Sequence, residues 1–331
     1  MKFSKNLFSD MASPDSALRK KGTASAKRIF YTAARLLVLS AIGYIIIYPL
    51  LQMIVTSVKD KNAFYDAARG WIPSSFNIKS NYSQAAEALK YWDGLKATLL
   101  YEMLAAVIEI LTCAVTAYGF ARFRFKFKGA FTACLFLTIL IPETMLIIPR
   151  SLNFAHLDFM GLFGLFDKLT GIDIRPNIVG TPLAFWLPSL FSMGLRSGII
   201  IYIYIQFFKS LPYELEEAAW VDGAGPVRTF VSIAVPSSSV VFVTVSVFSV
   251  IWHWNDNLIS QMYLLDDFPL AVNLERMNIT LKSMGYFIEQ DVEGQALFMA
   301  ACVLFLIPPL VLYMILQRKF IESIDRVGIT G

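Results

Sequence analysis

The sequence predicts an all-α integral membrane protein that crosses the membrane six times. Its 331 residues are 56% hydrophobic and 16% charged, which is too apolar for a soluble globular domain. A membrane-spanning helix needs about 20 mostly apolar residues to cross roughly 30 Å of hydrocarbon. Six runs qualify: residues 36–57, 99–118, 130–148, 181–205, 233–254 and 296–317.

The distribution of basic residues predicts the orientation of these six spans. Of the 29 lysines and arginines, 17 fall in the N-terminal segment, the second and fourth loops and the C-terminal tail, whereas 11 fall in the first, third and fifth loops. Because cytoplasmic loops carry an excess of Lys and Arg, both termini are expected in the cytoplasm. The remaining arginine, Arg196, lies within the fourth run. Pro182 and Pro188 also interrupt that run, and Pro236 interrupts the fifth.

Three units are expected along the chain. Residues 1–35 form a basic cytosolic extension, because they are largely polar and lack the apolar core of a cleaved signal peptide. Residues 36–317 form the membrane domain, and residues 318–331 form a cytosolic tail. The loops on the outer side are too short to hold a separate hydrophobic core.

The most informative motif lies in the cytoplasmic loop at residues 206–232 and just beyond it. Glu214 to Trp220 are good helix formers, with Pro212 ahead of them and Gly223 behind, so one short helix is expected. Small alanines and a turn glycine suit close docking into a socket on another protein. The motif consists of Glu217-Ala218-Ala219, three residues, Gly223, nine residues, Ile233, one residue, and Val235-Pro236.

Several polar residues fall at membrane depth, where an ionisable group costs several kcal/mol unless it is paired or hydrated. Glu102 and Glu109 are seven residues apart, which places them on one helical face. They, Arg196 and the pair Trp254-Asn255 are candidates for the substrate path. The alternative is a packing role through interhelical hydrogen bonds, and it is favoured because spacing alone does not place these groups on a cavity.

The motifs of common catalytic and metal sites are absent from the sequence. It has no G-x-x-x-x-G-K-[ST] phosphate loop, no H-E-x-x-H and no G-x-S-x-G, and its two histidines, His156 and His253, are far apart. Cys113, Cys134 and Cys302 lie inside apolar runs and are expected to be small buried residues. Neither an enzyme, a cofactor nor a metal is therefore expected. Juxtamembrane lysines and arginines meeting anionic lipid account for the net charge of +4 without nucleic acid.

From about Ile46 onward, the order of short motifs resembles one family of transport proteins. These motifs are Tyr48-Pro49-Leu50, Thr56-Ser57-Val58-Lys59, Asn81-Tyr82, the stretch from Ala117 to Lys126, Ile141-Pro142, Ile148-Pro149, the stretch from Phe207 to Pro212, Trp254-Asn255-Asp256 and the stretch from Gln317 to Ile321. Together with the loop motif they are similar to the inner-membrane permease subunits of binding-protein-dependent ABC importers of the maltose-type, carbohydrate-uptake class. In that family the loop motif is called EAA, and Val235 stands here where leucine is usual.

This resemblance implies a six-helix type I permease bundle in the bacterial cell membrane that carries a sugar, expected to be an oligosaccharide, and is no enzyme. The implied partners are a second homologous permease, a dimer of a cytosolic ATP-binding-cassette ATPase and an extracytoplasmic solute-binding protein. By the same resemblance, the loop helix docks on the ATPase. Its coupling residues are Glu217 and Asp222 for polar contacts, Ala218, Ala219 and Gly223 for close fit, and Pro236.

Two alternatives to sugar import remain at this stage. One keeps the ABC permease and changes its cargo to another small organic solute, such as glycerol phosphate. The other, weaker alternative is an ion-coupled secondary transporter that works alone.

Overall fold

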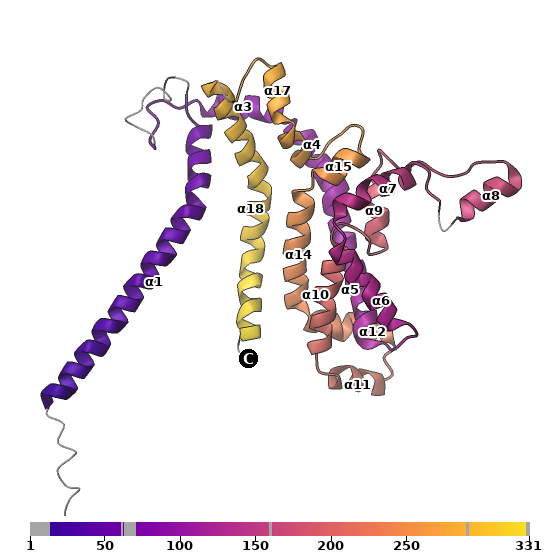
Figure 1. Cartoon of the computed structure of the whole chain (residues 1–331), viewed down its shortest axis with the longest axis horizontal. Coiled ribbons are helices and arrows are strands. Elements are labelled where there is room, and N and C mark those ends of the chain that lie inside the picture. The colour runs from indigo at the N-terminus through magenta and orange to yellow at the C-terminus, as the bar shows by residue number, and fades with distance from the viewer. Residues whose placement is uncertain (1–13, 61, 63–70, 159–160, 289–290, 329–331) are drawn as a thin grey trace, which may run out of the picture.

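In the computed structural model, helices account for most of the described chain, which comprises residues 14–60, 62, 71–158, 161–288 and 291–328. The helices α5, α10, α14 and α18 form the body of the molecule, with α1 to one side, and short helices cap one of its ends (Figure 1). An isolated antiparallel bridge joins Lys59 to Phe76. The all-α class predicted from composition is confirmed.

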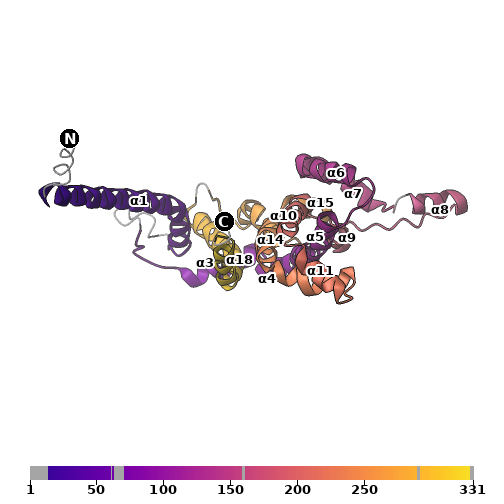
Figure 2. The same ribbon diagram turned by 90° about the horizontal axis from the view of Figure 1, so that it is seen from below.

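The first helix, α1 (Pro14–Ser57), diverges from the rest of the bundle (Figures 1 and 2). Its apolar part, Phe30–Ser57, has a mean hydropathy of 2.1, and none of its most apolar 18-residue window is buried within the chain. An apolar helix of this length needs lipid or another apolar helix around it. The chain by itself therefore leaves the most apolar part of this span exposed, although α1 also contacts α18.

The central span is a continuous helix from Tyr91 to Arg122, preceded by α3 (Ile78–Ala88). It begins as α4 (Tyr91–Ala97), passes through a π-helical turn called η2 (Thr98–Met103) and continues as α5 (Leu104–Arg122). Small residues on α5, including Ala105, Ala114 and Ala117, are completely or almost completely buried. Such residues let neighbouring backbones approach closely, which is how membrane helices pack.

The third predicted span bends sharply. Helix α6 (Lys128–Leu140) and helix α7 (Glu143–Ala155) meet at 103° across Ile141 and Pro142. Proline has no backbone N–H and disfavours helical conformation in the residue before it, so this break is a local consequence of Pro142. A further helix, α8 (Leu162–Thr170), projects away from the bundle (Figures 1 and 2).

The prediction of one continuous fourth span at residues 181–205 is wrong. The structure has α9 (Leu183–Leu190), a turn, and then α10 (Ser197–Ser210). Within that turn Ser192 and Arg196 have positive φ angles of 57° and 58°, a conformation that side chains rarely adopt. The apolar residues on both sides of the turn masked this break in the helix.

The last part of the chain completes the bundle. After α10 come α11 (Glu214–Val221), α12 (Pro226–Thr229), η3 (Phe230–Ala234), α13 (Val235–Ser237) and α14 (Ser239–Trp254), with a bend of 80° before α14. Three short caps follow, α15 (Leu258–Tyr263), α16 (Leu270–Glu275) and α17 (Met277–Ser283), and then the final helix α18 (Val292–Gly328).

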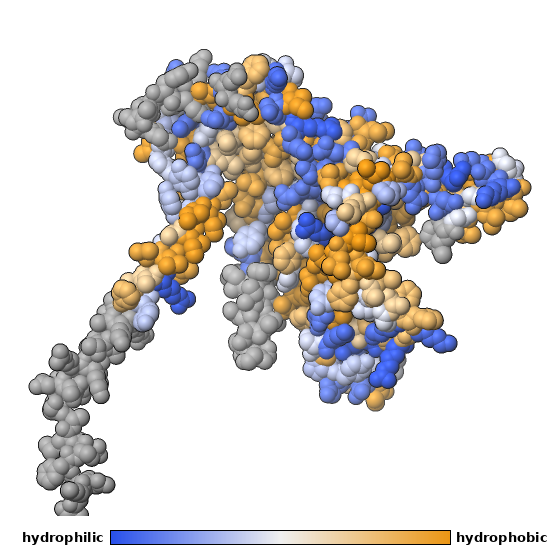
Figure 3. Space-filling model, in the orientation of Figure 1, coloured by the Kyte–Doolittle hydropathy of each residue, from blue (hydrophilic) through white to orange (hydrophobic). Residues whose placement is uncertain are grey.

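Three helices are long and apolar enough to cross a membrane by themselves, and five do so if each bent pair forms one span, counted over the described residues. Helix α10, at 14 residues, is about 21 Å long and is shorter than a full span. Hydrophobic surface dominates the middle of the molecule, and hydrophilic residues gather at its two ends (Figure 3). Membrane insertion therefore follows from the surface, while the count of six spans stays a prediction.

Helices α5, α10 and α14 share one hydrophobic core, in which Tyr118, Tyr204 and Phe208 are almost completely buried. The cysteines divide: Cys113 is buried in this core as predicted, Cys302 is partly buried, and Cys134 is exposed. The expectation of a buried Cys134 is wrong because helix α6 lies at the edge of the bundle, and only Leu135 of that helix is buried.

Candidate functional site

The loop helix predicted from the sequence is present as α11 (Glu214–Val221) at the end of the molecule opposite the short caps (Figure 1). It begins after Leu211-Pro212 and ends at Asp222. Gly223 then takes a left-handed φ of 79°, the conformation that glycine adopts without steric cost. The predicted start and stop signals of this helix are confirmed.

The residues of the motif divide between two faces of α11. Glu217, Ala218, Asp222 and Gly223 are exposed, and so is Pro236 farther along the chain. Ala219 is only 8% exposed and faces the bundle of its own chain. The exposed surface of α11 and of the turn after it therefore includes Glu217, Ala218, Asp222 and Gly223, and Ala219 belongs to the packing beneath it.

A buried ion pair holds α11 against the end of the central span. The Arg122 Nε donates to Glu216 Oε1 at 2.7 Å, and both side chains are at most 3% exposed. The Arg122 Nη2 also donates to the Leu211 carbonyl at 2.9 Å, and its guanidinium lies 4.6 Å from the centre of the Tyr213 ring. The Tyr213 hydroxyl donates to the Arg122 carbonyl at 3.1 Å. The loop is thereby joined to α5 by several contacts around one guanidinium.

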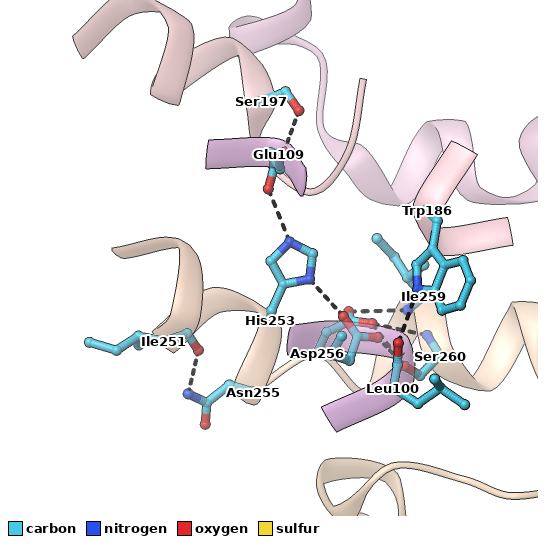
Figure 4. A network of polar contacts seen from close by, with 11 residues as sticks. Leu100, Glu109, Trp186, Ser197, Ile251, His253, Asn255, Asp256, Ile259 and Ser260 are labelled. Carbon is cyan, nitrogen blue, oxygen red and sulfur yellow. Dashed lines mark hydrogen bonds and ion pairs between the residues drawn. The ribbon is translucent and has the colours of Figure 1, made fainter. Parts of the chain in front are cut away.

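A second polar cluster lies inside the bundle and centres on His253 of α14. Its Nδ1 is 2.7 Å from Glu102 Oε2, and its Nε2 is 3.0 Å from Glu109 Oε2 (Figure 4). The Ser260 hydroxyl donates to Glu102 at 2.7 Å, and the Ser197 hydroxyl donates to Glu109. Each of the three ionisable side chains is at most 4% exposed. One imidazole therefore links two carboxylates of the central span to α14.

Asp256 extends this cluster just beyond the end of α14. Its carboxylate accepts the backbone N–H groups of Ile259 at 3.3 Å and Ser260 at 3.0 Å, which are the first-turn donors of α15. Burial, together with the negative charge of Glu102, raises the pKa of Asp256 to about 7, although the two backbone hydrogen bonds act in the opposite direction. The residue therefore fixes the chain turn between α14 and α15 and lies beside the buried histidine.

The five candidates for the substrate path occupy different places. Glu102 and Glu109 are 1% and 0% exposed, and Trp254 is 4% exposed with its ring 5.6 Å from that of Phe305. Asn255 is exposed and donates to the Ile251 carbonyl at 2.8 Å. The buried glutamates and Trp254 take packing positions in this conformation, which fits the favoured alternative from the sequence.

Arg196 and Asn255 are candidates that face open grooves, and the two grooves are different. Arg196 is exposed, and it lines a groove of about 500 Å³ between α6, α7 and the turn that leads into α10. Asn255 lines a different groove of about 470 Å³ together with Asn257 and Glu275. The structure thus separates two residues that the sequence placed in the same functional class.

Sequence reasoning missed the roles of His253, Arg122 and Glu216. His253 was considered for metal binding alone, and both of its ring nitrogens are occupied by carboxylates. Within the described residues, no group of three or more His, Cys, Asp or Glu side chains could hold a metal ion. A usable signal was the chemistry of the spans: two glutamates on one face of an apolar helix need a cationic or hydrogen-bonding partner, and His253 is a histidine in another span.

Comparison with known proteins gives consistent matches over most of the chain. The profile of the family described as "Binding-protein-dependent transport system inner membrane component" matches residues 110–326. The sn-glycerol-3-phosphate transport system permease protein UgpE of Escherichia coli (strain K12) is 26% identical over 285 residues, covering 85% of this chain and 91% of the relative. The protein of the same name from Shigella flexneri serotype 5b (strain 8401) matches with the same identity and coverage.

Solved structures share the fold at lower sequence identity. A bacterial ABC transporter involved in the import of the acidic polysaccharide alginate has a chain with a TM-score of 0.66 and 16% identity, covering 89% of this chain and 97% of that one. A bacterial alginate ABC transporter in complex with an alginate pentasaccharide-bound periplasmic protein gives a TM-score of 0.54 and 15% identity, with 86% and 94% covered. These structural matches support the arrangement of helices described above.

Replacing Glu216 with Gln should destabilise the protein far more than replacing its neighbour Glu217 with Gln. The first change leaves the Arg122 guanidinium buried without a counterion, which costs about 3 kcal/mol or more, whereas Glu217 is exposed. Apparent unfolding temperatures of the purified variants in the same detergent measure the difference. Equal unfolding temperatures would show that the ion pair contributes nothing to the attachment of α11.

The two histidines provide a matched test of the buried cluster. His253→Ala leaves Glu102 and Glu109 without their shared partner, so we expect a loss of about 3 kcal/mol or more, while His156→Ala at an exposed position should have almost no effect. Thermal unfolding again measures both. Adding Glu102→Gln and Glu109→Gln to His253→Ala should restore part of the loss, since coupled residues are not additive. No recovery would argue against electrostatic pairing as the cause.

Proposed function

Since the chain belongs to the family of binding-protein-dependent transport system inner membrane components, it is an inner-membrane permease subunit of an ABC importer, and we propose that it couples to a separate ATPase through α11. The observation that carries this proposal is the build of α11. Glu217, Ala218 and Asp222 are exposed to solvent, while Glu216 on the other face forms a buried ion pair with Arg122 of the central span. Such a helix can receive a force from outside and pass it to the membrane domain.

The coupling requires contacts that change between two states. An ATPase that closes on ATP shifts the permease only if it binds the two permease conformations with different affinity. Glu217 and Asp222 would supply polar contacts with the ATPase, and Ala218 and Gly223 would allow close approach. Arg122 would then carry displacement of α11 directly into α5, because the buried pair resists separation.

A carbohydrate is the proposed cargo, and an oligosaccharide is preferred. A permease chain of an importer for the polysaccharide alginate shares the fold, and the relatives similar in sequence are permeases for sn-glycerol 3-phosphate. Import of glycerol phosphate or another small organic solute therefore stays as the alternative. An ion-coupled secondary transporter no longer fits, since members of this family depend on a binding protein.

An extracytoplasmic solute-binding protein is the partner that follows from the family. We further propose a second, homologous permease and two copies of a cytosolic ATPase. The apolar span Phe30–Ser57, whose most apolar window has no burial within the chain, supports a second membrane protein beside α1. The two permeases would each form half of the translocation pathway, with Arg196 and Asn255 as the exposed candidates on this half.

The orientation proposed from the basic residues places α11 in the cytoplasm. The loop at residues 206–232 then faces the ATPase, and the extension at 1–35 and the tail at 318–331 lie on the same side. Most of the extension and all of the tail lie outside the residues whose side chains the structure describes. Their assignment therefore rests on the sequence.

Ala218→Leu and Gly223→Asp should each leave the permease inserted but reduce coupled uptake at least about tenfold, because α11 would no longer seat against the ATPase. Gly223 also has a positive φ, so its replacement adds backbone strain. Gly225→Ala is the matched control, since Gly225 has a negative φ and its added methyl group meets nothing within 4 Å. Co-purification of the ATPase and uptake into proteoliposomes give the readouts. Normal uptake by both variants would contradict the docking assignment.

The orientation can be tested with single cysteines in a cysteine-free background. Asp222→Cys should react with a membrane-impermeant maleimide only when the cytoplasmic side is accessible. Asp266→Cys, at an exposed position in the loop that follows α15, should react only from the outside. Cell-surface labelling of the first variant and protection of the second would invert the topology.

A further inference from the structure

The groove that contains Arg196 has the size of a ligand site. Its volume of about 500 Å³ lies within the range of roughly 300–1,000 Å³ typical of small-molecule pockets. Charged and polar groups contributed by different elements line it: Glu143 and Arg150 from α7, Ser192 and Arg196 from the turn before α10, and Thr138 from α6. The remaining lining is mostly aliphatic. This combination of an apolar wall and a few polar groups is typical of binding sites.

The Arg196 guanidinium is held in place by an aromatic ring and forms no close ion pair, although the charge of Glu143 on the same groove acts on it from a greater distance. Its central carbon lies 5.0 Å from the centre of the Trp252 ring, and that ring stacks on Phe248 at 5.6 Å. A guanidinium that lies over an aromatic face keeps the N–H groups at its edge available for hydrogen bonds. Among the described residues, no carboxylate forms an ion pair with Arg196 within 4.0 Å. The side chain therefore offers a positioned fork of donors.

The position of Arg196 along the chain indicates that its charge lies at membrane depth. Helix α10 starts directly after Arg196, is about 21 Å long and leads at its other end into α11. If α11 lies in the cytoplasm, Arg196 stands within the roughly 30 Å of hydrocarbon rather than beyond it. An exposed arginine at that depth faces a water-filled cavity or a counterion, since lipid contact is too costly.

The charges that face the groove do not balance. Arg150 and Arg196 bring two positive charges, and Glu143, at 3.9 Å from Arg150, brings one negative charge. Glu109 lies behind Gly194, and its two oxygens are occupied by Ser197 and His253. Glu102, Asp256 and His253 likewise form contacts within the buried cluster. The groove lining therefore carries one more positive charge than negative charge.

We propose that this groove binds the anionic group, a carboxylate or a phosphate, of an acidic carbohydrate during import, with Arg196 as the contacting residue. The assignment rests on the proposed import function and narrows its substrate class. Arg196 donates to the anion, Trp252 positions the guanidinium, and Arg150 adds a second positive charge. Planar, bidentate recognition of carboxylate and phosphate is the chemistry for which arginine is best suited.

Equilibrium binding to the assembled importer in lipid nanodiscs, without the solute-binding protein, tests this assignment. The probes are two pairs that differ in charge: glucose 6-phosphate against glucose, and tetragalacturonate against maltotetraose. At least one acidic probe should bind about tenfold or more tightly than its neutral counterpart, and Arg196→Gln should remove that preference. The pair that shows the preference identifies phosphate or carboxylate as the recognised group.

Three further variants keep the test specific. Arg196→Lys should retain part of the preference, and Arg150→Gln should weaken it without Arg196 being touched. Arg175→Gln should leave it unchanged, because Arg175 pairs with Asp167 and Asp173 away from the groove. Native mass spectrometry of each variant reports whether the subunits stay assembled.

Two results would overturn the assignment. In the first, a complex that is assembled and hydrolyses ATP binds acidic and neutral probes equally, or binds none of the probes. In the second, the second permease dissociates from the Arg196→Gln variant, while the Arg150→Gln variant keeps the full preference for acidic probes. Arg196 would then be a contact between subunits. A failure of the proposed import function gives a different result. In that case the purified complex would contain no ATPase.

Discussion

The bundle depends on the neutralisation of charges that its own apolar surroundings cannot solvate. The central span carries three such groups, Glu102, Glu109 and Arg122, and each finds its partner on another element. His253 of α14 contacts both glutamates, and Glu216 of α11 forms an ion pair with the arginine. Because an unpaired charge at this depth costs several kcal/mol, α14 and α11 cannot move away from the central span independently. The same constraint fixes the register of the bundle and attaches the loop that contains α11 to it.

Through these contacts the central span connects α11 at one end of the molecule to α14 and the turn before α10. At one end, Arg122 connects it to α11, and farther along the helix Glu102 and Glu109 connect it to α14 and to the turn before α10. Glu102 lies within the π-helical turn η2, where one extra residue per turn changes the direction of the side chains that follow. Turns of this kind occur frequently at functional sites, and here the turn coincides with the contact to His253. Motion of α11 would thus reach the turn before α10 through Arg122, the helix α5 and the contact between Glu109 and Ser197.

The sequence predicted what local signals determine and missed what distant pairing determines. Pro212 and Gly223 were sufficient for the bounds of α11, because helix start and stop depend on backbone conformation alone. The break before α10 was hidden by the apolar residues on both sides of Arg196, which satisfy a composition test whether or not the chain turns. His253 contacts Glu109 across 144 residues, and Glu216 is one of three glutamates in a short helix, so neither partner could be chosen without the fold. Helical class and membrane insertion, in contrast, follow from hydropathy summed over long windows.

Depth in the membrane is therefore an incomplete criterion for a substrate path, and the pairing state of each charge supplies what is missing. Glu102 and Glu109 qualify by depth, yet both are almost completely buried and occupied by partners from their own chain. Arg196 qualifies by depth and is also exposed in a groove, with an aromatic ring that orients it and no carboxylate of the described chain within ion-pair distance of 4.0 Å. Charges that are paired within the chain hold helices together, and replacing one of them lowers the stability of the protein. A charge that the fold positions but leaves unpaired remains available to an ion from outside the chain, which is the property that a transport pathway for acidic solutes requires.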